Sequence, residues 1–301
     1  MTSSRMRPVF DLTPARWVVD GVGDFGAGVG ALVPAGFERY ARILYPATRD
    51  DDRPVRWADV AAWAGRTLHP RAQFASISRP APGAGTGDPP FDEPPGAGDP
   101  RPELLTALCE VLARHTRTAE RCWICLWDGY AFLQPSAWGS IVAFMTEEKP
   151  GEWSAGPDAG DSLELTASLA PPDEDEGEGA GSDSGSAGGP AGEPREPGDA
   201  PFPPEVLNGP KVELPGREYI LLEGPLDAVR EPDWDEIWSQ APNLFWPDDR
   251  AWCVNVEIDL DSAYLGGPAA LVEDLLADPR LEAFPVEITD PITFGSDDVN
   301  R

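Results

Sequence analysis

The chain has 301 residues, of which 53 are Asp or Glu and 23 are Lys or Arg, so its formal net charge at pH 7 is -30. This length is enough for one large domain or two small ones. The negative charge argues against binding to nucleic acids or to anionic membrane surfaces, because both require Lys and Arg. The negative charge is compatible with binding of a cation or of a basic protein partner. It is equally compatible with a role in solubility alone.

Two features favour a cytoplasmic location. The N-terminal sequence MTSSRMRPVFDLTPAR lacks the apolar run of a signal peptide, and no stretch approaches the roughly 20 apolar residues of a membrane span. The four cysteines are then expected to be buried free thiols: Cys109, Cys122, Cys125 and Cys253. Cys122 and Cys125 have the CxxC spacing of redox and zinc sites, but in a strand their side chains would face opposite sides. A thiol site stays an alternative.

The first part of the chain predicts a strand, a loop and a helix. Residues 16–20 are the strand candidate, and GVGDFG after them has the GxGxxG spacing of dinucleotide-binding loops. More glycines follow where that fold needs a helix, so a flexible loop is the preferred interpretation. Apolar residues at helical spacing between Pro34 and Pro46 predict a helix.

The next segment predicts two helices separated by a long loop. Residues 57–64 have helical periodicity and precede Gly65, a typical helix end. Residues 80–102 are dense in Pro, Gly and Asp, so we expect a mobile loop. Residues 103–115 carry the most regular apolar stripe of the chain, with His115 expected to pack at its rim.

Two segments predict strands that lie inside a sheet. Residues 121–128 and 217–223 are apolar on both faces, which is typical of a strand covered on both sides. Between them, residues 152–205 contain fourteen acidic residues and one Arg. Such a segment cannot bury enough apolar surface to offset its chain entropy, so we expect it to be disordered.

The stretch PNLFWPDDRAWCVNVEIDLDSAYLGGPAALVEDLL, residues 242–276, has the strongest local pattern. Trp252 to Asp261 alternates between an apolar face and a polar face, which predicts one strand. The preceding WPDD and the following Gly266-Gly267-Pro268 predict turns, and a helix should follow. Further on, residues 286–289 are a candidate edge strand.

These elements predict an α+β fold with a mostly antiparallel sheet and flanking helices in a single domain, interrupted by the acidic insert. The expected plan is residues 1–151 as the first part of the domain, 152–205 as the disordered insert, 206–295 as the second part, and 296–301 as a frayed tail.

In their order, several blocks resemble a group of uncharacterised proteins from high-GC bacteria. The blocks are VPAGFERYARILYP, WADVAAWAGRTLHP, HTRTAERCWICLWDGY, REYILLEGPLDA, and PNLFWPDDRAWCVNVEIDLDSAYLGG with ADPRLEAFPV. The PNLFWPDDRAW block is the most specific of them. The resemblance implies a shared fold and a removable middle insert, and it implies no activity and no catalytic residue.

One candidate site is a set of carboxylates on the predicted strand. Glu257, Asp259 and Asp261 would share one face, where their mutual repulsion requires solvent, protonation, an arginine partner such as Arg250, or a cation such as Mg²⁺. The alternative function is therefore a metal-assisted enzyme acting on a small polar substrate. Motifs such as GxSxG and HExxH do not occur, so no reaction is specified.

The leading hypothesis is a binding protein. The chain has 11 Trp, and indoles often line recognition surfaces. We expect Trp246 and Trp138, both in turns, to be partly exposed, and Trp246, Asp248, Asp249 and Arg250 to form a recognition surface with Trp138. The negative charge favours a basic protein as the partner. Neither the oligomeric state nor the partner's identity follows from the sequence.

Overall fold

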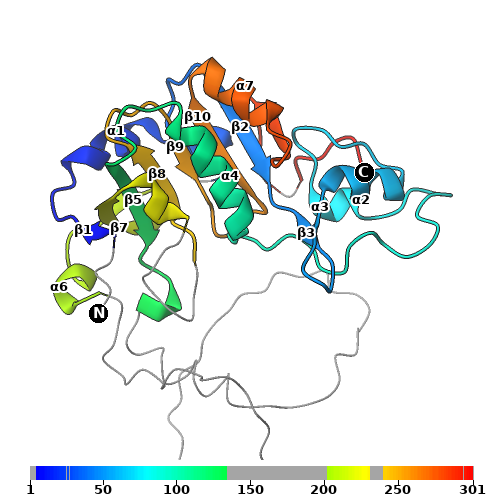
Figure 1. The fold of residues 1–301 in the computed structure, drawn as a ribbon, viewed down its shortest axis with the longest axis horizontal. Coiled ribbons are helices and arrows are strands. Elements are labelled where there is room, and N and C mark those ends of the chain that lie inside the picture. The colour runs from blue at the N-terminus through cyan, green and yellow to red at the C-terminus, as the bar shows by residue number, and fades with distance from the viewer. Residues whose placement is uncertain are drawn as a thin grey trace, which may run out of the picture. The chain divides into compact units, whose positions relative to one another are not determined.

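The structure is a computed structural model that describes residues 5–24, 26, 28–133, 202–230, 240–293 and 295–300. It confirms the α+β fold, with nine strands in one sheet whose described pairings are all antiparallel (Figure 1). The strand order is β1 (Arg7–Pro8), β7 (Arg217–Gly224), β5 (Cys122–Trp127), β8 (Leu244–Pro247), β9 (Cys253–Asn255), β10 (Ser262–Gly267), β2 (Arg39–Leu44) and β11 (Ala283–Val286). A ninth strand, β6 (Val212–Leu214), also pairs with β7.

Helices cover both faces of the sheet around β5. Their bounds are α1 (Arg16–Gly21), α2 (Trp57–Ala64), α3 (Phe74–Ile77), α4 (Pro102–Ala113), α6 (Pro204–Leu207) and α7 (Ala269–Ala277), and β3 (Ala47–Thr48) pairs with β4 (Pro54–Val55). Val18 of α1 packs in one cluster with Trp123 and Cys125, whereas Cys109 of α4 lies near Cys122 on the opposite face. Both faces of β5 are therefore buried, as its sequence predicts.

For two segments the predicted type of secondary structure is wrong. Residues 16–20 lie in the helix α1, not in a strand, and residues 39–44 form the strand β2, not a helix. β2 is paired on one edge with β10 and on the other with β11, and five of its six residues are buried. These long-range pairings override a local spacing that happened to fit a helix.

The predicted strand from Trp252 to Asp261 is also wrong in its length. β9 ends at Asn255; the N–H of Val256 still donates to the carbonyl of Asn243, and the chain then turns through residues 256–261 into β10. Gly266 lies inside β10, not in a turn; a Cβ there would be 2.4 Å from the Phe37 ring. The helix after Pro268 is confirmed as α7.

The C-terminal tail, predicted to fray, is anchored. Ser296, Asp297 and Asn300 are buried, and Asp297 accepts hydrogen bonds from the N–H of Gln73 and the side chain of Asn300. The His69 ring lies 3.0 Å from the same carboxylate. The tail is therefore part of the core around α3.

The remaining predictions are partly tested. The helices at residues 57–64 and 103–115 are confirmed as α2 and α4, and the expected edge strand is β11, three residues earlier than predicted. Most of the 152–205 segment lies outside the described residues, but its end overlaps α6. No helix among the described residues is long and apolar enough to cross a membrane.

Candidate binding site at the Asp248–Ala251 turn

The turn between β8 and β9 contains three of the predicted recognition residues, Asp248, Asp249 and Arg250. β8 and β9 pair through Leu244 with Asn255 and through Phe245 with Val254, and the N–H of Arg250 donates to the carbonyl of Pro247 at 2.8 Å. The turn therefore extends from a paired, buried part of the sheet, which fixes its position.

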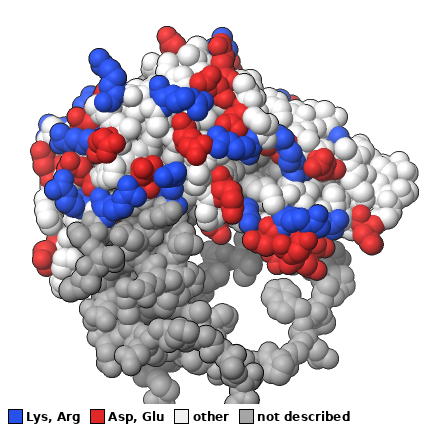
Figure 2. Space-filling model, viewed as in Figure 1, with Lys and Arg blue, Asp and Glu red and all other residues white. Residues whose placement is uncertain are grey.

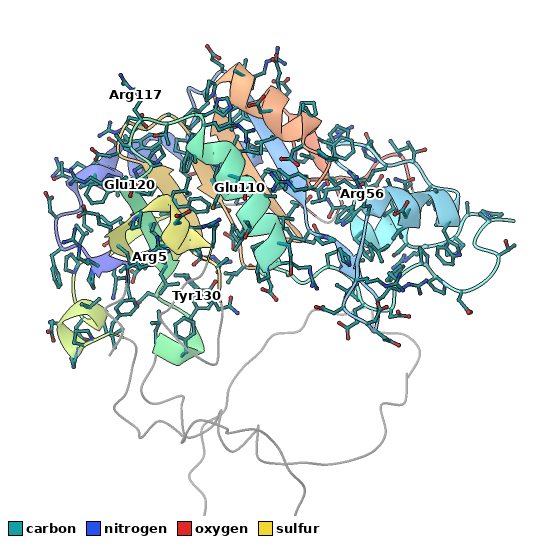
Figure 3. The ribbon with its side chains drawn as sticks, viewed as in Figure 1. Arg5, Arg56, Glu110, Arg117, Glu120 and Tyr130 are labelled. Atoms are coloured by element: carbon teal, nitrogen blue, oxygen red, sulfur yellow. The ribbon has the colours of Figure 1, made fainter. Side chains whose placement is uncertain are left out.

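Asp249 holds the turn to the segment that follows α4. Its carboxylate accepts hydrogen bonds from the hydroxyl of Thr116 and from the N–H groups of Arg117 and Ala251, and its own N–H donates to Thr118. Burial alone would raise the pKa of Asp249, but these hydrogen bonds lower it below the ordinary value. The side chain of Arg117 meanwhile extends into solvent (Figure 3). Asp249 is thus a structural residue with little left to offer a partner.

The side chains of Asp248 and Trp246 differ in their exposure to solvent. Trp246 is fully buried, so the prediction that it is partly exposed is wrong: it lies in β8 opposite Trp123 of β5, inside the sheet. Asp248 is 40% exposed and accepts a hydrogen bond from the Trp123 indole at 2.9 Å. Beside it, the Arg121 guanidinium lies 4.9 Å from the Trp123 ring and pairs with Glu223 at 3.2 Å.

Arg250 is the exposed centre of the turn. Its φ of 54° lies in the left-handed region, which among the described non-glycine residues only Asp52 shares. Its guanidinium lies over the ring of Trp17, which itself packs edge-on against Trp246. Within the described part of the chain, Arg250 makes no ion pair. Arg250 is therefore an exposed arginine with a left-handed backbone and no ion pair among the described residues.

A cleft of about 470 Å³ opens beside this turn. Its charged lining consists of Asp11, Arg121, Glu223, Asp248 and Arg250. The cleft thus offers both signs of charge at close range, and the guanidinium groups of Arg121 and Arg250 lie over indole rings. Such an arrangement can recognise a partner's carboxylate and a partner's cation side by side.

The predicted carboxylate face does not exist, because its three residues lie in the turn after β9. Glu257 and Asp259 both accept from the Arg217 guanidinium at 2.6 Å, and Asp261 accepts from Arg42 at 3.3 Å. Burial raises the pKa of Asp261, and the positive charge of Arg42 and its hydrogen bond reduce this increase. Among the described residues, no group of three or more His, Cys, Asp or Glu side chains is arranged to hold a metal ion.

All four cysteines are free and buried, as predicted. Burial raises the pKa of Cys122 to about 12, and it raises that of Cys125 as well. A thiol that stays protonated is a poor nucleophile and a poor metal ligand.

The sequence did not single out Trp17, Arg121 or Arg217 as site residues. Arg217 begins a strand and Arg121 precedes one, and an arginine beside an apolar strand is a signal that could have been used. Trp17 lies in a segment whose element type was predicted wrongly. Trp138 lies outside the described residues.

Comparison with protein-family profiles, with curated proteins and with solved structures finds no match. The resemblance to proteins of high-GC bacteria therefore stays a prediction.

Proposed function

We propose that this chain is a binding protein and that its Arg250 turn, together with the adjoining cleft, recognises a protein partner. The observation that carries the proposal is the Arg250 guanidinium, which is exposed and has no ion pair among the described residues. A left-handed backbone at a non-glycine residue costs about 1–2 kcal/mol, and such strain is concentrated at functional sites.

The charges suggest two levels of recognition. The net charge of -30 attracts a basic protein over long distances. On the face shown in Figure 2, acidic and basic side chains are interspersed, so close-range recognition depends on individual groups. The partner we propose is basic overall, places a carboxylate against Arg250 and places a cationic side chain near Asp248. Its compartment would be the cytoplasm, which fits the free cysteines.

The alternative, a metal-assisted enzyme using Glu257, Asp259 and Asp261, has less support. Arg217 and Arg42 already engage these carboxylates, and an arginine in contact opposes the approach of a cation.

Partner capture tests the proposal. The full chain is immobilised and exposed to native lysate at about 0.15 M salt, where weak surface attraction is screened. Arg250→Gly should lose the partner, because it removes the guanidinium while glycine tolerates the backbone. The matched control is Arg53→Gln, at another exposed arginine. Trp246→Ala is unsuitable, because that side chain is buried.

A second variant separates the folded domain from the acidic segment. Deletion of residues 152–200 removes most of the segment and leaves α6 intact. If the partner is held equally by Arg250→Gly and by the unaltered chain, but not by the deletion, the binding surface is in the acidic segment and the proposal is wrong.

A further inference from the structure

A second cavity, of about 350 Å³, lies away from the Arg250 turn. It opens to the surface and is lined by the end of β2, by β4, by the starts of α2 and α4, and by the loop between α7 and β11. Its volume is at the small end of known ligand pockets and leaves room for a molecule of roughly a dozen non-hydrogen atoms.

The walls of this cavity divide into an apolar part and a cationic part. Leu44, Pro54 and Leu104 supply apolar surface, together with further prolines. Three arginines, Arg56, Arg101 and Arg280, line the cavity from three separate segments. Figure 3 places Arg56 between α4 and α2. The cavity thus combines a surface for an apolar body with groups that favour an anion.

Two of these arginines are held in place by carboxylates that do not line the cavity. Arg101 makes paired hydrogen bonds to Asp52 at 2.7 and 2.9 Å, and Arg280 makes paired hydrogen bonds to Asp278 at 3.0 and 2.8 Å. These hydrogen bonds fix the positions of the two guanidinium groups, and the carboxylates largely neutralise their positive charge. Arg101 and Arg280 therefore make this wall rigid, but neither is the main binding group for an anionic ligand.

Arg56 is engaged differently. Its two terminal nitrogens donate to the carbonyls of Pro279 at 3.4 Å and Leu281 at 3.2 Å, which are neutral acceptors. Each terminal nitrogen carries two hydrogens, so each retains an N–H group for a ligand. Its nearest carboxylate is Glu282 at 3.8 Å.

The two acidic residues that line the cavity, Glu282 and Glu103, do not accept hydrogen bonds from the free N–H groups of Arg56. Glu282 receives the N–H groups of Trp57 at 2.7 Å and Ala58 at 3.0 Å, so the start of α2 already uses its oxygens. Glu103 is 76% exposed and contacts Arg101 at 3.4 Å.

We propose that this cavity binds a small monocarboxylic acid, with its apolar body against Leu44, Pro54 and Leu104 and its carboxylate on Arg56. This site is separate from the Arg250 turn, and its ligand does not depend on the proposed protein partner.

Titration calorimetry on the full chain tests the assignment, with butanoate, hexanoate, octanoate and the matched amide octanamide as probes. Affinity should rise about fourfold for each added methylene that reaches the apolar wall. Octanamide should bind at least tenfold more weakly than octanoate, because it cannot form a charged pair with Arg56.

Variants locate the ligand. Arg56→Gln should weaken octanoate binding tenfold or more, Arg56→Lys should recover part of the loss, and Arg53→Gln should have no effect. Equal binding of octanoate and octanamide, equal binding to Arg56→Gln and Arg53→Gln, or no binding of octanoate would each overturn the proposal. The comparison of acid and amide needs only the unaltered chain, so it decides the matter even if a variant fails to fold.

Discussion

Replacing Arg250 by glycine and by alanine separates the cost of its backbone from the value of its side chain. At a φ of 54°, a residue with a Cβ lies in the left-handed region, whereas glycine adopts this conformation without a steric penalty. Alanine keeps the penalty and loses the contact with Trp17. Glycine loses the same contact and removes the penalty.

The expected magnitudes follow from these two contributions. The left-handed conformation costs a non-glycine residue about 1–2 kcal/mol. The contact between the guanidinium and Trp17 is partly exposed and contributes about 0.5–1 kcal/mol. Glycine also gains more entropy in the unfolded chain, which offsets about 0.4–1 kcal/mol of its advantage. Arg250→Ala should therefore be less stable than the unaltered chain by about 0.5–1 kcal/mol, and Arg250→Gly should be nearly as stable as that chain.

Urea unfolding of the three proteins measures this order, with the midpoints compared at a common slope. Partner capture on the same proteins should fail for both variants, because both lack the guanidinium. If alanine and glycine give the same midpoint, the left-handed conformation costs no more than the entropic offset of about 0.4–1 kcal/mol, which is below the expected penalty. If glycine unfolds at clearly lower urea than alanine, the reasoning about the left-handed conformation is refuted.

Three further predictions concern other parts of the fold. Trp246→Ala should lower the free energy of unfolding by about 3–5 kcal/mol, as measured by urea unfolding, because it leaves a cavity in the sheet; a loss under 1 kcal/mol would contradict its full burial. Burial alone would raise the pKa of Asp297, but its hydrogen bonds lower it, so the tail is stabilised above the unfolded pKa of about 4 and loosens as the pH falls through the folded pKa. Hydrogen exchange at Asn300 should increase from pH 6 to pH 3 relative to the intrinsic rate, and Asp297→Asn should remove most of that change. The thiol of Cys122, with a pKa of about 12, should react with a disulfide reagent at pH 8 only after urea unfolding, and rapid reaction of the native protein would contradict its packing.

The sequence predicted elements well where local pattern and tertiary environment agree. In β5 and β7, both faces are apolar and both become buried. In α2 the apolar stripe and the helix ends coincide with the structure, and Gly65 adopts the left-handed conformation after it. In α4 the stripe is confirmed, but the helix begins one residue earlier and ends two residues earlier than predicted. At these positions the local preference and the fold point the same way.

The wrong predictions concern segments whose secondary structure is determined by residues far away in the sequence. The helical spacing at residues 39–44 says nothing of β10 and β11, which turn that segment into a strand. The alternation from Trp252 to Asp261 continues past the point where pairing with β8 ends. The same error placed three carboxylates on one face and hid the arginines that engage them, since Arg217 lies 40 residues from Glu257 in the chain. Arg250 is an exposed turn residue, as the sequence predicted, but its left-handed backbone and its contact with Trp17 arise from the tertiary fold.

The position of β2 between β10 and β11 has a consequence for synthesis of the protein. Arg42 in β2 meets Ser262 in β10 across 220 residues of sequence, so β2 leaves the ribosome long before either neighbour exists. During that interval its backbone groups and its apolar side chains have no strand to pair with. Folding dominated by such distant pairings is slow. Segment 39–44 therefore stays without its partner strands until residues 262–286 have been synthesised.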